Sequence, residues 1–145
     1  MTAEELIAAL DLAPHPEGGW YRETFRSKAD PGERAAATAV YYVMQSGQRS
    51  RWNRVDADEM WLWHGGDPLD LTIAESEHRA ARTVRLGGRV GEGERPQVIV
   101  PAGCWQAAEP VDGEAGYTFL SCVVAPAFEF ANYELAPAGW APGGS

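Results

Sequence analysis

Glu59 is the residue whose setting in the sequence best suits acid–base chemistry. It begins the run EMWLWH (residues 59–64), and strand alternation places Glu59, Trp61 and Trp63 on one face. Indole rings beside a carboxyl group exclude water and raise its pKa, because the charged form loses hydration. Glu59 is therefore a candidate general base. The alternative is a solvated carboxylate at the start of a strand.

Tyrosine hydroxyls could supply a proton donor that faces such a base across a ligand. Tyr21 and Tyr42 both lie in strand-like segments and are the candidate donors. Alternation around Tyr21 places Glu23 on the same face and Arg22 on the other. This pattern fits the wall of a ligand pocket, and it fits a strand between subunits equally well.

The three histidines are less suited to act with Glu59. His15 precedes Pro16, which predicts an extended loop residue of the kind usually found at the surface. His64 ends the run that Glu59 begins and faces the other side of the strand. His78 lies in a charged run that predicts a solvated face. We therefore expect no histidine in the site of Glu59.

Short strand-like segments make up most of the chain. They are rich in Val, Tyr, Trp, Phe and Thr and are separated by Gly, Pro and Asp clusters, as in a sandwich or barrel. A capping box of Thr2 and Glu5 precedes an apolar stripe and predicts one helix over residues 3–12. The predicted strands cover residues 20–27, 38–44, 50–55, 59–64, 69–74, 82–86, 97–100, 105–108, 117–124 and 128–135.

Length, composition and charge limit the classes of function. The 145 residues suit one domain, which we place at residues 1–136, followed by a flexible tail at 137–145. A net charge of -9 repels the phosphates of nucleic acid and anionic membrane surfaces. No run approaches the roughly 20 apolar residues of a membrane span. We expect a cytoplasmic protein without nucleic-acid or membrane partners, whose Cys104 and Cys122 are buried reduced thiols.

Four blocks of sequence resemble one known family. They are HPEGGWYRET (15–24), SRWNRVDADEMW (50–61), VPAGCWQ (100–106) and VAPAFEF (124–130), in this order. Their order is typical of the fifth-type cupin domain, an uncharacterised family of RmlC-like cupins, which the chain resembles over residues 3–136. The resemblance implies an all-β fold, the cupin double-stranded β-helix or jelly-roll barrel, with one short N-terminal helix.

The resemblance also implies a motif site, from which this sequence departs. Cupins commonly supply His-x-His and Glu from a first motif and His from a second, a set that suits a divalent first-row metal. Here Arg51 and Asn53 stand at the positions of the paired histidines, Gln106 stands at that of the last histidine, and Glu59 alone keeps its type. A guanidinium cannot ligate a cation and amide oxygens bind such metals weakly. We expect weak or absent divalent metal and no other cofactor.

Two functions remain open at this point. The first is binding of a small polar or anionic ligand, such as a sugar, in the barrel. The second is a metal-independent isomerase or epimerase acting on a sugar nucleotide, with Glu59 and Tyr21 as catalytic residues; a metal-dependent cupin enzyme is a weaker third. The residues predicted to bind the ligand are Arg22, Tyr42, Arg51, Asn53, Glu59, Trp61 and Gln106.

The role of Glu59 separates the two functions. If Arg51 points inward, it attracts an anionic ligand and keeps Glu59 charged as an anchor. If burial against indoles dominates, Glu59 becomes an acid–base group. The family resemblance also implies a homodimer.

Overall fold

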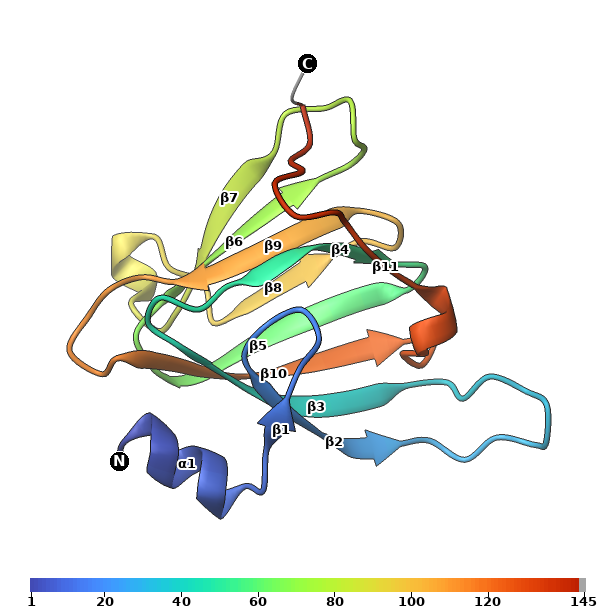
Figure 1. The fold of residues 1–145 in the computed structure, drawn as a ribbon, viewed down its shortest axis with the longest axis horizontal. Coiled ribbons are helices and arrows are strands. Elements are labelled where there is room, and N and C mark those ends of the chain that lie inside the picture. The colour runs from blue at the N-terminus through green and yellow to red at the C-terminus, as the bar shows by residue number, and fades with distance from the viewer. Residues whose placement is uncertain (144–145) are drawn as a thin grey trace.

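The structure, a computed structural model, describes residues 1–143. Two antiparallel sheets are stacked face to face (Figure 1), with strand orders β1-β2-β3-β10-β5-β8 and β11-β4-β9-β6-β7. The elements are α1 (Ala3–Ala9), β1 (Ala13–Pro14), β2 (Trp20–Arg26), β3 (Thr38–Gln45), β4 (Ser50–Val55), β5 (Asp58–Gly66), β6 (Leu69–Ala74), β7 (Arg82–Leu86), the 3-10 helix η1 (Val90–Glu92), β8 (Gln97–Val100), β9 (Trp105–Pro110), β10 (Tyr117–Ala125), the 3-10 helix η2 (Phe130–Asn132) and β11 (Tyr133–Leu135).

The all-β prediction with one N-terminal helix is confirmed, and four predicted strands, β4, β6, β7 and β8, have the predicted bounds. The helix ends earlier than residue 12. Its C-cap is Leu10, and Asp11 has a φ of 55°, which breaks the helical backbone. Strand β1 and helix η1 were not predicted, because two or three residues carry too little pattern.

The strand predicted over residues 128–135 is wrong in its first part. Helix η2 turns the chain there, and only Tyr133–Leu135 form a strand. The turn packs the rings of Phe128, Phe130 and Tyr133 against one another, with centroids 4.9 to 5.8 Å apart. Alternating aromatic residues resemble a strand in sequence, but here they form a cluster after β10.

The main core lies between the sheets. Trp61, Leu69, Leu86 and Leu120 are all at most 1% exposed there. Burial of such side chains is worth about 1.5–3 kcal/mol each. Outside the larger sheet, Leu6 of α1 packs in a separate apolar cluster. No helix among residues 1–143 combines the length and the apolar character needed to cross a bilayer.

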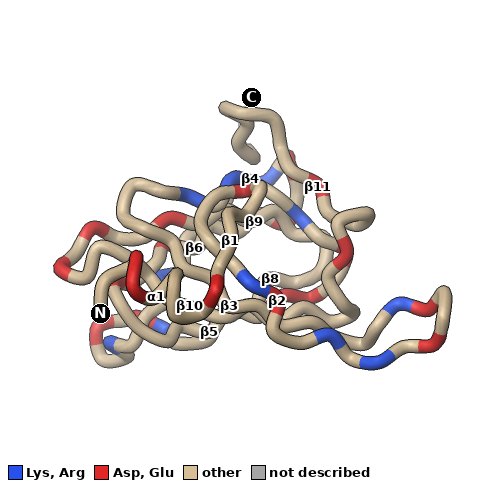
Figure 2. The backbone as a smooth tube through the Cα atoms, turned by 60° about the horizontal axis from the view of Figure 1, so that its bottom comes forward, with Lys and Arg blue, Asp and Glu red and all other residues tan. Residues whose placement is uncertain are grey.

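Two peripheral segments extend from the stacked sheets. The β2–β3 loop, residues 27–37, projects from the larger sheet and carries both acidic and basic residues (Figure 2). Beyond β11, Trp140 lies 4.5 Å from Trp105 between ring centroids, and the Gly143 N–H donates to the Glu77 carbonyl. The predicted flexible tail is thus in contact with the smaller sheet through residue 143, and its last two residues lie outside the described part.

Candidate functional site

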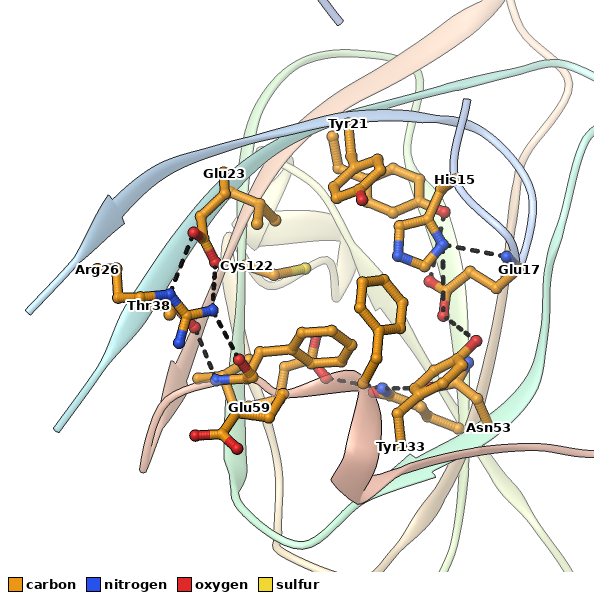
Figure 3. Close-up of a pocket in the computed structure, with 17 residues that line it drawn as sticks. His15, Glu17, Tyr21, Glu23, Arg26, Thr38, Asn53, Glu59, Cys122 and Tyr133 are labelled. Carbon is orange, nitrogen blue, oxygen red and sulfur yellow. Dashed lines mark hydrogen bonds and ion pairs between the residues drawn. The ribbon is translucent and has the colours of Figure 1, made fainter. Parts of the chain in front are cut away.

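A cavity of about 270 Å³ opens between the two sheets. Strands β2, β3, β4, β5, β9 and β10 contribute to its wall, and the segment after β10 closes one side (Figure 3). Two glutamates, Glu17 and Glu59, lie in this wall although they are only 7% and 9% exposed. Buried carboxyl groups are rare without ion pairs, which marks the cavity as the candidate site.

Glu17 enters the cavity from the loop between β1 and β2. The Gly18 backbone has a φ of 114°, and a Cβ there would lie 2.1 Å from the Arg49 carbonyl oxygen. Glycine therefore lets the loop lie directly against the chain that enters β4. The Arg51 N–H also donates to the Glu17 carbonyl at 3.0 Å. The HPEGG block thus fixes the backbone that carries the Glu17 carboxyl.

Two phenols meet the Glu17 carboxyl group. The Tyr133 hydroxyl donates to Oε2 at 3.1 Å, and the Tyr42 oxygen lies 3.3 Å from Oε1. Burial, and after it the charge of Glu59, raise the pKa of Glu17 to about 7, although hydrogen bonds from Ser50 and the phenols oppose the rise.

The contacts of Tyr42 match a protonated Glu17. Its hydroxyl also donates to the Gly18 carbonyl. A phenol has one proton, so it cannot donate to both acceptors at once. When the Tyr42 hydroxyl donates its proton to the Gly18 carbonyl, the Tyr42 oxygen can accept a hydrogen bond from a protonated Glu17 Oε1. The hydrogen-bond pattern therefore accommodates the neutral carboxyl.

Glu59 is held by a chain of side-chain amides. Trp61 Nε1–H donates to Gln106 Oε1 at 3.1 Å, which orients the amide, and Gln106 Nε2 donates to Glu59 Oε1 at 2.8 Å. Gln106 Nε2 also donates to Asn53 Oδ1 at 3.1 Å, and Asn53 Nδ2 donates to the Arg51 carbonyl at 2.7 Å. Burial raises the pKa of Glu59, although the hydrogen bonds from Gln106 and Cys122 counteract the rise.

His15 also lines the cavity, so the expectation that no histidine joins Glu59 is wrong. Its Nδ1 accepts the Glu17 N–H at 3.0 Å, which makes Nε2 the protonated nitrogen of the neutral ring. The ring packs edge-on to Tyr21 with centroids 4.4 Å apart. Desolvation lowers the pKa of His15 to about 4, so the imidazole is an uncharged donor at neutral pH.

Among the predicted site residues, the structure brings together Tyr21, Tyr42, Asn53, Glu59 and Gln106. Trp61, 1% exposed, lies behind Gln106 in the core rather than in the cavity wall.

The two predicted arginines lie outside the cavity wall. Arg51 donates from Nη2 to the Ala136 carbonyl at 2.9 Å, and Arg22 donates from Nη1 to the Leu10 carbonyl at 3.3 Å. The pairing of β4 with β9 shifts register between Ser50 and Asn53, which turns Arg51 out of the alternation. The expected ion pair of Arg51 with Glu59 is therefore not formed.

A second register shift places Arg26 in the cavity wall, although strict alternation along β2 puts it on the face opposite Glu23. The pairing of β2 with β3 shifts between Glu23 and Phe25, so Arg26 lines the cavity together with Glu23. Their side chains form an ion pair at 2.8 Å, and Arg26 Nη2 also donates to the Phe128 carbonyl at 2.8 Å. Sequence reasoning also missed Glu17 and Tyr133, and the two glycines after Glu17 were the one local signal of a constrained loop.

The motif residues do not fit a divalent metal. Gln106 Oε1 accepts from Trp61, and Asn53 Oδ1 accepts from Gln106, so both amide oxygens already have donors. Within residues 1–143, no group of three or more His, Cys, Asp or Glu side chains is arranged to hold a metal ion. The low metal content expected from the sequence stays a prediction for elemental analysis.

Comparison with known proteins relates this geometry to solved structures. A hypothetical protein from Leishmania major is 34% identical, with a TM-score of 0.87 over 97% of this chain and 90% of that one. A protein from Shewanella oneidensis is 35% identical, with a TM-score of 0.85 over 94% and 85% of the two chains. No curated protein is significantly similar in sequence.

A more distant likeness concerns the fold alone. Oxalate decarboxylase from Bacillus subtilis is 14% identical, with a TM-score of 0.63 over 84% of this chain and 29% of that one. The two-sheet arrangement is therefore that of the cupins. The model of one cupin family matches residues 4–136, which is most of the sequence. The chain belongs to this family, the Cupin superfamily (DUF985).

Proposed function

We propose that the chain is a metal-independent acid–base enzyme that moves protons on a small polar ligand held in the cavity. One observation carries this proposal: Glu17 and Glu59 are both buried at the same cavity, and neither forms an ion pair with Lys or Arg in the described chain. Because both carboxyl groups are buried in one cavity without a cationic partner, they resist being ionised at the same time, so the pair retains a proton near neutral pH.

The surroundings assign the proton to Glu17. Burial and the charge of Glu59 raise the pKa of Glu17 to about 7, although hydrogen bonds to both carboxyl groups favour their charged forms. At neutral pH Glu17 is therefore close to half protonated, and in our proposal Glu59 is the carboxylate of the pair. An acid and a base with pKa values near the working pH are what proton transfer requires.

The step that this arrangement supports is enolisation. Glu59 takes the proton of a C–H bond next to a carbonyl group, the electron pair of that bond forms C=C, and the carbonyl oxygen takes the proton of Glu17. Where the carbon that lost its proton also carries a hydroxyl group, Glu59 returns the proton to the former carbonyl carbon while Glu17 takes the proton of that hydroxyl, which completes an isomerisation and restores both carboxyl groups. His15, as a neutral Nε2–H donor, can orient the carbonyl oxygen.

The cavity also limits the ligand. Its volume of about 270 Å³ lies just below the range of ligand sites, which is about 300–1,000 Å³. A compound of monosaccharide size fits better than a whole sugar nucleotide. An anion is disfavoured, because Arg26, the one basic side chain among the lining residues, is already paired with Glu23. We therefore propose a smaller ligand without negative charge, whereas the anionic ligand and the sugar nucleotide inferred from sequence stay predictions.

Isotope labelling tests the proposal without a known substrate. The purified protein is incubated in D2O with a protein-free extract of cell metabolites, and mass spectrometry identifies compounds that gain deuterium on carbon. Wild-type protein should label at least one small carbonyl compound, and Glu59→Gln and Glu17→Gln should each slow labelling by about 100-fold or more.

The matched control is Glu109→Gln, which makes the same change at an exposed position of β9. Its labelling should equal that of the wild type. Labelling that survives in Glu59→Gln contradicts the role of Glu59 as the base. A ligand retained by the protein without any labelling contradicts an enzyme and leaves a binding protein.

A further inference from the structure

The cavity wall has an excess of acidic groups. Four glutamates line it: Glu17, Glu23, Glu59 and Glu129. Arg26 neutralises Glu23 at 2.8 Å. Glu17 and Glu59 remain as the two acids that are deeply buried, and within the described chain no basic side chain forms an ion pair with either, apart from the uncharged His15. A ligand that carries positive charge would supply the missing partner.

Aromatic rings form the other half of the cavity wall. Phe128, Phe130 and Tyr133 are mutually inclined at 86°, 63° and 83°, with centroids 4.9, 5.6 and 5.8 Å apart. Three rings set nearly at right angles make a corner, which we call the aromatic corner. Tyr21 and Tyr42 are further aromatic residues of the same cavity. Ring faces carry negative electrostatic potential and attract cations, most strongly where water is excluded.

The acids and the rings are parts of one wall. The Tyr133 hydroxyl donates to Glu17 Oε2 at 3.1 Å, so one residue of the aromatic corner contacts a buried acid directly. Glu59 accepts hydrogen bonds from Gln106, at 2.8 Å, and from Cys122, and a carboxylate has about four acceptor positions. Acceptor capacity therefore remains on Glu59 for a ligand donor.

From these observations we infer that the cavity selects a compact organic cation, with its ammonium group between the carboxyl groups and the aromatic corner. This inference rests on the proposed function for the identity of the site and adds the class of its substrate. An uncharged ligand leaves the Glu59 carboxylate without a counter-charge, and an anion adds a further negative charge beside it. The Nε2–H of His15 remains available for an oxygen atom of the same ligand.

Charge-matched probes test the ligand class. Choline, its uncharged isostere with carbon in place of nitrogen, and the tert-butylacetate anion have nearly the same shape and differ in charge. Ethanolamine adds a primary ammonium group. Calorimetry or ligand-observed NMR gives the dissociation constant of each. We expect at least one of the two cations to bind about tenfold or more tightly than the isostere, and the anion to bind most weakly.

Variants locate the effect in the cavity. Glu59→Gln should remove the preference for the cation over the isostere, because it removes charge and keeps shape, whereas Glu109→Gln on the exposed face of β9 should retain it. Phe130→Leu, which replaces a ring that is 52% exposed, should weaken cation binding several-fold and leave the fold intact.

The outcomes separate this inference from the proposed function. If neither cation binds more tightly than the isostere, or if Glu59→Gln keeps the preference, the ligand class is wrong, whatever the deuterium labelling shows. If cations are preferred but no metabolite is labelled, the ligand class stands and the enzyme proposal fails.

Discussion

Replacing Glu17 by Gln should stabilise the protein above neutral pH and change its stability little in acid. In the folded state the pKa of Glu17 is raised from 4.5 to about 7, with burial as the main cause. A group that binds its proton more tightly when folded favours folding at low pH, and this contribution is lost as the pH rises from the unfolded value through the folded one. The window therefore runs from about pH 4.5 to pH 7.

The size of the effect follows from the same two values. A tenfold change in proton affinity is worth about 1.4 kcal/mol, so the interval between 4.5 and about 7 corresponds to about 3 kcal/mol at pH values above 7. Glutamine has the shape of the protonated carboxyl and no charge to lose. Its carbonyl can accept from Tyr133 and its amide can donate to the Tyr42 oxygen, as the neutral acid does.

Urea unfolding of wild type and Glu17→Gln, at several pH values from below 4.5 to above 7, measures the difference. The two free energies of unfolding should agree at the acid end, and the variant should exceed the wild type by up to about 3 kcal/mol at the alkaline end. Glu109→Gln, on an exposed part of β9, should show no such divergence. A variant less stable than the wild type above pH 7, or a difference independent of pH, refutes the protonated Glu17.

Three further measurements address other parts of the site and the assembly. Nitrogen NMR should find His15 as the neutral Nε2–H tautomer until the pH falls toward 4. Because the pKa of His15 in the folded protein lies below the ordinary value of 6.5, the stability that this residue contributes is present above pH 6.5 and is lost as the pH falls toward 4. A titration midpoint near 6.5 contradicts the buried imidazole. Elemental analysis should find well under one equivalent of iron, manganese, nickel or zinc; near-stoichiometric metal that disappears in Glu59→Ala overturns this expectation. Light scattering should report a homodimer. We expect it to form through β2, because Phe25 of this strand is 54% exposed. A species at the single-chain mass of 15.7 kDa counts against the homodimer.

The sequence predicted the strands well, because their alternation and turn residues are local signals. The inward position of Glu59 and the contact of Gln106 with it both follow once the cupin strands pair as the motif blocks imply. Trp61, in contrast, was predicted to bind the ligand, but it is 1% exposed and lies behind Gln106 in the core.

The errors arise where pairing departs from strict alternation. A register shift leaves no mark in the composition of a strand, yet it moves the following side chains to the other face. One shift takes Arg51 out of the cavity and another brings Arg26 in. The anchor interpretation of Glu59 depended on Arg51, so one bulge decides between two chemical roles.

The acid of the proposed pair comes from a loop, where periodicity says nothing about direction. Glu17 reaches the cavity because Gly18 lets the β1–β2 loop touch the chain before β4, and Tyr133 meets it from helix η2 and β11 at the far end of the sequence. The base, Glu59, is set by strand pairing and by Gln106. Acid and base are thus positioned by different elements, a loop and a strand, but they are linked electrostatically, because the charge of Glu59 raises the pKa of Glu17.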